Sequence, residues 1–361
     1  VSEFTGHKAG ITSLAAGYGN RGPLLVSGSE DKTSRLWDTR SGKAICGVVG
    51  FEKEVVAADF VGDSSIAIAS GASISLYDQR YIGTVHNARN SGAVYVCKDD
   101  SGESEIQAIS TRGDFVAFVD DDGRLGVFDI TDPEMLTGKS VRFSSDGHDA
   151  MAACVCFHPE EPVVATGAFD RQVCVWDVAS EKVIRRSVAR PIAESAQHVG
   201  AGAPGATTSN MVNPPFVYAL DFVPGFAYAD DVPNKEEDRE QWMVVSGHAD
   251  GRIMCTGAKS AVCWTDCHSY SITALRFMRS HPEILATAGL DRTIKLWNSD
   301  SIISPDNVDG DNEDSAAVVR DSLPLLAHID LAAKPDTLAT FEEASVIYTD
   351  ENNSVVAFAI V

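Results

Sequence analysis

Histidine, hydroxyl and aspartate side chains recur together in this sequence, and sets of this kind can carry acid–base and nucleophilic catalysis. Three such sets occur with similar spacing, and each ends on a tryptophan. They are His7, Ser27, Asp31 and Trp37; His148, Thr166, Asp170 and Trp176; and His268, Thr287, Asp291 and Trp297. Tryptophan offers one N–H donor, the hydroxyl donates and accepts, histidine bridges, and aspartate accepts. Because the whole set recurs at fixed spacing, we interpret it as a structural hydrogen-bond relay.

The segment Cys263-Trp-Thr-Asp-Cys267-His268 could suggest a metal site or a cysteine–histidine dyad. The spacing of its cysteines is not that of a two-residue zinc knuckle, and no second Cys/His pair follows nearby. Adjacent residues on a strand point to opposite faces, which argues against a dyad of Cys267 and His268. We therefore interpret both residues as structural.

Other patterns that could support chemistry are incomplete. Asp309, Asp311 and Glu313 alternate as calcium ligands can, but the loop lacks the glutamate that an EF-hand needs at its twelfth position. No glycine-rich phosphate loop follows a strand and opens a helix. The sequence therefore predicts no catalytic residues, no cofactor and no metal site, in a protein that is not an enzyme.

The elements that position these residues are themselves repeated. An aromatic residue follows a turn acid or amide by six residues in five places: Asp31/Trp37, Asp122/Phe128, Asp170/Trp176, Asp291/Trp297 and Asn352/Phe358. In the first copy, residues 11–15, 24–26, 33–37 and 44–49 read as four short strands separated by turn residues. This pattern predicts an all-β fold. Four antiparallel strands in a repeat of about 40–45 residues match one blade of a propeller.

The repeats resemble those of the WD-repeat β-propeller family. The first reads Ser27-Gly-Ser-Glu-Asp31-Lys-Thr-Ser-Arg-Leu-Trp37-Asp38, and residues 166–177 and 287–298 follow it closely. The equivalent third-strand positions are Trp37, Tyr77, Phe128, Trp176, Thr256, Trp297 and Phe358. The resemblance implies an all-β, seven-bladed WD-repeat β-propeller, with residues 1–361 forming a single domain. Blade two has Gly71 in place of the turn acid, and blade five has Asp250 but Thr256 in place of the aromatic residue.

The two ends of the chain predict how the ring closes. The last unit offers only three strands, at about residues 336–340, 345–348 and 354–361, while residues 1–4 form an extra strand before the first blade. Pairing the N-terminal strand with the last blade removes both sheet edges. We also predict flexible insertions at about residues 189–213, 224–241 and 299–322, which are rich in glycine or in charged residues.

Composition excludes several classes of partner. The net charge is −23, so phosphate backbones and anionic lipids repel the chain, and we expect no nucleic-acid partner. No run of about 18 apolar residues predicts a membrane span, and the N-terminus has no pattern of a secretory signal. Most of the eight cysteines lie within apolar strand patterns, which favours a reducing, intracellular compartment, cytoplasmic or nuclear.

Two neighbouring repeats end their third strand on the same motif. Trp37-Asp38-Thr39-Arg40 ends it in the first and Tyr77-Asp78-Gln79-Arg80 in the second. Both resemble the aromatic-Asp-x-Arg motif of WD-repeat proteins that dock on the propeller adaptor of cullin-4 ubiquitin ligases. The resemblance implies a protein-binding site in a substrate receptor, formed by Trp37, Asp38, Arg40, Tyr77, Asp78 and Arg80. Arginine there can bind carboxylates and carbonyls bidentately. Alternatively, the two arginines pair with acids of neighbouring turns.

The sequence leaves two kinds of non-enzymatic function open. In the first, the protein is an interaction scaffold that docks on the cullin-4 ligase adaptor. In the second, it is a general scaffold or a peptide reader that binds basic peptides, such as histone-like tails, at the mouth of the central channel. The second would be favoured if the structure showed an exposed cluster of aromatic and acidic residues at that mouth. We expect a monomer that works within a larger complex.

Overall fold

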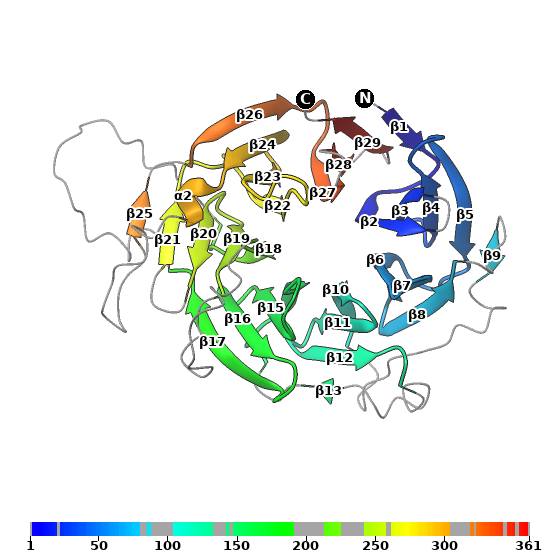
Figure 1. Ribbon diagram of the computed structural model, residues 1–361, viewed down its shortest axis with the longest axis horizontal. Helices are drawn as coiled ribbons and strands as arrows, with labels where there is room; N and C mark the ends of the chain where they lie inside the picture. Colours follow the sequence, from blue (N-terminus) through cyan, green and yellow to red (C-terminus); the bar gives the residue numbers. More distant parts are fainter. Residues whose placement is uncertain are drawn as a thin grey trace.

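The fold is a ring of seven β-sheets around a central channel (Figure 1). The computed structural model describes residues 2–19, 22–79, 85–87, 104–132, 142–143, 147–190, 213–224, 242–257, 261–303, 318–320, 323–341, 345–350 and 354–359. The sheets follow one another around the ring in sequence order, and neighbouring strands are antiparallel through the first four strands of each blade, or the first three in blade two. The predicted seven-bladed, all-β propeller is confirmed.

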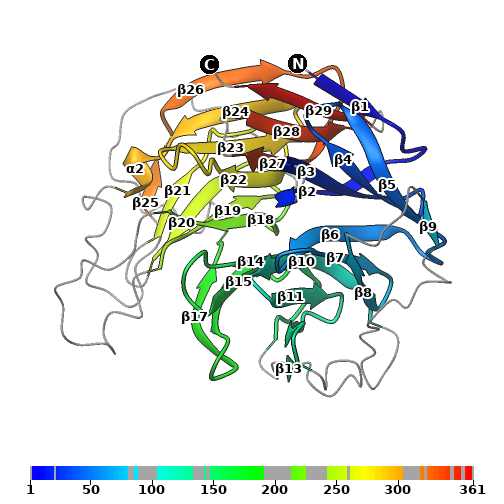
Figure 2. The same cartoon turned by 45° about the vertical axis from the view of Figure 1, so that its right-hand side comes forward.

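Each blade begins at the channel and ends at the outer rim (Figures 1 and 2). Blade one contains β2 (Ile11–Gly19), β3 (Gly22–Ser29), β4 (Ser34–Asp38) and β5 (Lys43–Val49). Blade two contains β6 (Val55–Val61), β7 (Ser65–Ser70) and β8 (Ser73–Asp78). Blade three contains β10 (Ile106–Arg112), β11 (Phe115–Asp120), β12 (Leu125–Asp129) and β13 (Arg142–Phe143).

The remaining blades follow the same plan. Blade four contains β14 (Ala152–Phe157), β15 (Val163–Ala168), β16 (Gln172–Asp177) and β17 (Lys182–Val188), and blade five contains β18 (Val217–Phe222), β19 (Val244–His248), β20 (Ile253–Thr256) and β21 (Ala261–Trp264). Blade six contains β22 (Ile272–Phe277), β23 (Ile284–Gly289), β24 (Thr293–Asn298) and β26 (Leu325–Asp330). Blade seven contains β27 (Pro335–Phe341), β28 (Ser345–Asp350), β29 (Ser354–Ala359) and β1 (Ser2–Thr5).

Burial along the strands follows from their place in a blade. The middle strand β15 is buried at all of its positions because neighbouring blades cover both of its faces. The outer strand β17 alternates between exposed and half-buried residues because one of its faces meets solvent. Trp37, Trp176 and Trp297 are 1–2% exposed, so the repeated aromatic position fills the interface between blades.

Every innermost strand carries the same β-bulge near its start. Its first residue pairs with the second strand, its second residue is skipped, and pairing resumes at the third. The skipped residues are Thr12, Val56, Gln107, Ala153, Tyr218, Thr273 and Asp336. All of them line the channel. Since a bulge re-aims the side chain it inserts, the repeated bulge builds one level of the channel wall.

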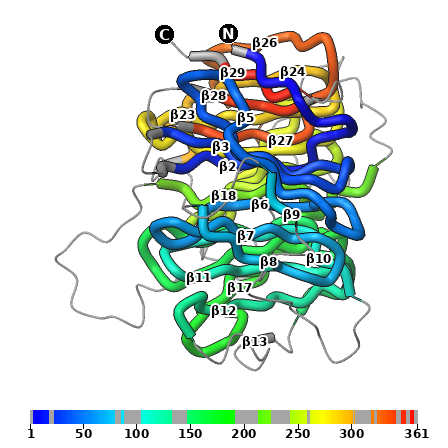
Figure 3. Tube along the Cα trace, turned by 90° about the vertical axis from the view of Figure 1, so that its right-hand side faces the viewer, coloured from blue at the N-terminus to red at the C-terminus, as the bar shows by residue number. Residues whose placement is uncertain are grey.

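The N-terminal strand closes the ring as predicted. β1 pairs antiparallel with β29, so Phe4 lies opposite Val355 and Thr5 opposite Ser354 (Figure 3). Phe4 is 1% exposed and its ring packs edge-on against Trp37 of blade one, 6.0 Å between centroids. The closing strand therefore also contributes to the interface between the last blade and the first.

Three features depart from a regular four-stranded plan. The described part of blade two forms three strands, and the next short strand, β9 (His86–Asn87), joins blade one instead. β25 (Val318–Arg320) joins blade five in the same way. A short helix, α2 (Asp300–Ile303), follows blade six's third strand; no helix in the described ranges is long and apolar enough to cross a bilayer.

The predicted insertions lie largely outside the described residues. The structure describes 189–190 and 213 of the first, Pro224 of the second, and residues 299–303 and 318–320 of the third. Asn352 of the fifth aromatic pair also falls outside them.

Candidate functional site

The His, Ser and Asp residues of blade one form the predicted relay. His7 Nδ1 lies 3.0 Å from the Asp31 carboxylate. His7 Nε2 lies 2.8 Å from Ser27 Oγ, which also accepts the Trp37 N–H at 2.9 Å. Asp31 in addition accepts the backbone N–H groups of Lys8 and Thr33, and so orders the turn between β3 and β4.

The relay recurs with almost the same geometry in blades four and six. The distances from histidine to aspartate, histidine to hydroxyl, and tryptophan to hydroxyl are 2.9, 2.8 and 2.8 Å in both (His148, Asp170, Thr166, Trp176; His268, Asp291, Thr287, Trp297). Every polar atom of each set is engaged within its blade. The relay interpretation is thus confirmed.

Electrostatics keep the relay aspartates ionised. Burial alone raises the pKa of Asp291, but hydrogen bonds from His268 and Thr293 outweigh it, and the net shift lowers that pKa well below its usual range. The pKa of Asp31 is lowered by the same balance. Burial is also the main reason that the pKa of His268 is lowered, so the imidazole is neutral at physiological pH.

Blade five replaces the relay with a different arrangement. His248 lies at the end of β19 rather than before the blade, with Nε2 2.9 Å from Ser246 Oγ and Nδ1 3.1 Å from the Pro215 carbonyl. Asp250 forms a buried ion pair with Arg252 instead of binding a histidine. The turn acid that the sequence places in blade five is therefore present, but its partner has changed from histidine to arginine.

Cys267 and His268 do not lie on a strand, contrary to the expectation from the sequence. Both lie in the bend after β21, so the rule of alternating faces does not separate them. What separates them is bonding: His268 is held by Asp291 and Thr287, while Cys267 Sγ lies 3.5 Å from the Trp264 carbonyl oxygen. Burial raises the pKa of Cys267 to about 12, which leaves a thiol rather than a nucleophilic thiolate.

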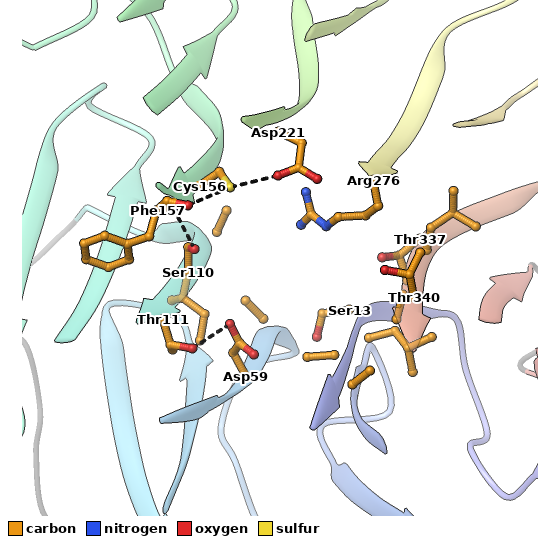
Figure 4. Close-up of a pocket in the computed structure, with 18 of the residues that line it drawn as sticks. Ser13, Asp59, Ser110, Thr111, Cys156, Phe157, Asp221, Arg276, Thr337 and Thr340 are labelled. Carbon is orange, nitrogen blue, oxygen red and sulfur yellow. Dashed lines mark hydrogen bonds between the residues drawn. The ribbon is translucent and has the colours of Figure 1, made fainter. Parts of the chain in front are cut away.

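The central channel is a cavity of about 640 Å³ lined by the innermost strands. Three of its lining residues are charged and lie at equivalent positions, four residues after the start of their strands: Asp59, Asp221 and Arg276 (Figure 4). The Arg276 side chain is open to the solvent of the channel although the ring encloses it on all sides. Enclosure alone lowers its pKa, but the charge of Asp221, and to a smaller degree that of Asp59, outweighs this and raises it.

Polar groups in the channel mainly link one blade to the next. The Asp221 carboxylate of blade five accepts the Phe277 N–H of blade six at 3.0 Å. Arg276 of blade six donates back to the Leu220 carbonyl of blade five at 3.0 Å. Ser110 accepts the Phe157 N–H in the same manner, as Figure 4 shows. The described residues contain no group of three or more His, Cys, Asp or Glu side chains placed to hold a metal ion.

An aromatic cluster at the channel mouth was not predicted from the sequence. Phe169, in the turn between β15 and β16, stacks on Phe216 with centroids 5.0 Å apart and meets Tyr218 edge-on at 5.2 Å. Tyr218 is the bulged residue of β18, lines the channel and is 37% exposed. We call Phe169, Phe216 and Tyr218 the mouth cluster. A signal existed, because Phe169 stands where the matching repeats have Glu30 and Leu290.

The two docking motifs end the third strands of blades one and two. Trp37 and Tyr77 are buried in the blades, whereas Asp38 and Asp78 are half-buried at the strand ends. The Arg40 side chain is 63% exposed, and its Nε lies 3.7 Å from Asp38 Oδ1.

The same Asp38 carboxylate accepts the backbone N–H of Arg40 at 3.0 Å. That hydrogen bond is the main cause of the lowered pKa of Asp38. Arg80 lies outside the described residues, so the expected pairing of the two arginines side by side stays a prediction.

The parts of the chain that carry the relay match a known family of repeats. The family model described as WD domain, G-beta repeat matches residues 1–38, 139–177 and 258–298. Each matched segment contains one complete relay and ends within one residue of its tryptophan. The chain therefore contains WD repeats, in three blades of its propeller.

Curated relatives match this chain at modest identity. Pre-mRNA-processing factor 19 homolog 2 of Arabidopsis thaliana is 25% identical over 175 residues, 48% of this chain and 31% of the relative. The WD repeat-containing protein 53 homolog of Dictyostelium discoideum is 26% identical over 231 residues, 61% and 58% respectively. Restriction of telomere capping protein 1 of Saccharomyces cerevisiae is 26% identical over 155 residues, 43% and 9%. The matched part is less than two thirds of each relative's length.

The repeats and the closed ring are those of a protein-interaction scaffold. Propellers of this kind offer two faces and an outer rim to partners, whereas their polar cores are occupied by internal hydrogen bonds. The chemistry that remains available for binding therefore lies at the mouth cluster, at the turns that carry Asp38 and Arg40, and along the rim.

Proposed function

We propose that residues 1–361 form one propeller domain, an intracellular scaffold of the cytoplasm or nucleus. In this proposal it docks through Arg40 and Arg80 on the adaptor of a cullin-4 ubiquitin ligase and acts as a substrate receptor. The observation that carries the proposal is the exposed Arg40 guanidinium at the end of β4, which lies 3.7 Å from the Asp38 carboxylate. A planar, exposed guanidinium suits bidentate binding to carboxylate or carbonyl groups.

The aromatic-Asp-x-Arg motif of blades one and two is absent from blades four and six, which supports a specific role. The equivalent turns read Asp177-Val178-Ala179 in blade four and Asn298-Ser299-Asp300 in blade six, so arginine is not a requirement of the fold.

Co-purification of the ligase adaptor with tagged protein tests this proposal. The double variant Arg40→Ala plus Arg80→Ala is expected to lower adaptor recovery at least tenfold, because a central interface arginine contributes about 2 kcal/mol or more. The matched control is Lys8→Ala, an exposed cation in the turn before β2, on the opposite face of the ring. Equal recovery with wild type and the double variant would sink the docking claim.

The mouth cluster favours a second candidate function, the binding of basic peptides. An exposed tyrosine ring beside two further aromatic rings can hold a lysine or arginine side chain by cation–π attraction. Asp336, the bulged residue of β27, adds a carboxylate at the same level of the channel. The net charge of −23 attracts such peptides at long range. The turns that carry the cluster lie on the face opposite Arg40, so the two functions are compatible.

Titration with a synthetic Lys/Arg-rich peptide tests this second function. Tyr218→Ala is expected to weaken binding about fivefold, in line with about 1 kcal/mol for a cation–π contact. Tyr270→Ala serves as the control, since Tyr270 is 63% exposed but makes no ring contact with the mouth cluster. Identical affinity of the Tyr218→Ala variant and wild type would argue against a peptide-binding mouth.

A further inference from the structure

Two blades of this ring carry a fifth strand on their outer edge. In blade one, β9 pairs in parallel with the end of β5, with His86 opposite Val48. In blade five, β25 pairs in parallel with β21, with Val318 to Arg320 opposite Val262 to Trp264. Figure 1 shows β9 and β25 outside the fourth strands of these two blades. The outer edge of a blade is therefore a surface that accepts further strands.

The equivalent edge of blade four is residues 185–188 of β17. Aligning the third strands on Trp37, Trp176 and Thr256 makes Ser187 the counterpart of Val48 and of Trp264. Arg185 and Arg186 are then the counterparts of Val262 and Cys263. Within the part of the chain that the structure describes, no strand pairs with this edge.

The exposed face of β17 is apolar and basic in alternation. Ile184 and Val188 are 44% and 49% exposed, and the exposed Arg186 lies between them. Lys182 continues the pattern toward the start of the strand. Arg186 donates to Gln172 Oε1 at 3.2 Å and to the Gly147 carbonyl at 3.3 Å, which fixes its guanidinium over the strand. β17 contains no acidic residue, although the whole chain carries a net charge of −23.

We propose that the outer edge of β17 is a docking site for an extended acidic segment of a partner protein, which joins blade four as a fifth strand. On one face this segment presents an acidic residue beside Arg186, flanked two residues away on each side by apolar residues that pack against Ile184 and Val188. Backbone hydrogen bonds supply affinity and the alternating side chains supply selectivity, as in other cases of strand addition. The site does not depend on docking at Arg40 and Arg80.

The charge of the edge selects this partner over others. Cations on an open edge oppose pairing with copies of the same strand and with basic or neutral strands. They favour a strand with carboxylates at the facing positions, because opposite charges on neighbouring strands stabilise the pair. The counterpart edge on β26 of blade six differs, with His328 and Asp330 in place of Arg186 and Val188. Of these two outer strands, only β17 presents arginine at the position beside which the acidic residue would lie.

A synthetic peptide, Thr-Val-Thr-Glu-Thr-Val-Thr, is the probe for this site. Its binding to the full chain is measured by fluorescence anisotropy, and amide hydrogen exchange locates the site. We expect saturable binding and slower exchange at residues 185–188. Replacing the glutamate with lysine is expected to weaken binding about tenfold, and N-methylation of alternate backbone amides to abolish it. Absence of binding, equal binding of the N-methylated peptide, or protection elsewhere on the ring overturns the proposal.

Arg186→Glu and His328→Glu form a matched pair of variants, since the two residues occupy equivalent positions on the outer strands of blades four and six. Arg186→Glu is expected to weaken the glutamate peptide about tenfold and to restore the affinity of the lysine peptide. His328→Glu leaves both affinities unchanged. The exchange of preference between peptides separates a lost contact from a damaged fold, which only lowers both affinities. Equal effects of the two variants would contradict a site on β17.

Discussion

Buried histidines make the stability of this ring depend on pH. His7 and His268 are each bonded at both ring nitrogens, to a carboxylate at Nδ1 and to a hydroxyl at Nε2. A second proton on either ring would displace the hydrogen that the hydroxyl donates to it, and burial lowers the pKa of both imidazoles. His248 of blade five is fully buried, and its burial lowers its pKa to about 4. The neutral imidazole is thus part of the folded state.

The free energy of unfolding is expected to fall as pH falls from about 6.5 to 4. In this window the unfolded chain binds a proton at His248 while the folded chain does not, so the folded state loses about 3 kcal/mol from this residue. His158, whose pKa burial lowers to about 4, acts in the same direction. Urea unfolding at several pH values measures the slope. His248→Gln is expected to make it shallower by about one proton, and an unchanged slope would contradict this role.

At the residue scale, the sequence was sufficient wherever a residue type recurs at fixed spacing. His7, Ser27, Asp31 and Trp37 were assigned correctly because three copies constrained one another. Tyr218 was not found, because its exposure at the channel mouth depends on a β-bulge that no single residue reveals. The Asp250–Arg252 ion pair was missed for a related reason: the turn acid was visible, but its partner depends on where the blade places His248.

At the scale of elements, the stability of the fold depends on how its strands close the ring. Without β1, the last blade has an open edge at β29, and the interface with blade one loses Phe4. Closure links residues about as far apart in the chain as they can be, so the ring is stable only when both ends are in place.

Phe4→Ala is expected to destabilise the protein by about 3–4 kcal/mol, the range for removing a buried phenylalanine. Thermal and urea unfolding measure the loss. Val85→Ala, at an exposed position, is the control and is expected to be nearly neutral. A loss below about 1 kcal/mol for Phe4→Ala would show that the closing strand contributes little to the core.

The number of blades and the closure of the ring could be predicted, because the repeat recurs along the sequence and its last copy is one strand short. The fifth strands β9 and β25 could not, since they contain two and three residues and their pairing is long-range and parallel. The missing fourth strand in the described part of blade two has the same origin, as the residues expected there supply β9 to blade one.

At the scale of the whole molecule, the ring separates the three surfaces that we propose for binding. Antiparallel strands place the turn that carries Arg40 on one face and the turn that carries Phe169 on the other. Strand β17 runs along the rim (Figure 1). In the proposed function, this separation lets one scaffold hold a ligase adaptor and a second protein together.

Titration of the purified chain with the purified cullin-4 ligase adaptor tests the central claim most directly. Isothermal calorimetry or biolayer interferometry gives the affinity of wild type, of Arg40→Ala plus Arg80→Ala, and of Arg40→Lys plus Arg80→Lys. We predict binding by wild type and at least a tenfold loss in both variants, because lysine keeps the charge but not the bidentate geometry. No binding by wild type, or equal affinity of wild type and the alanine variant, would contradict the account.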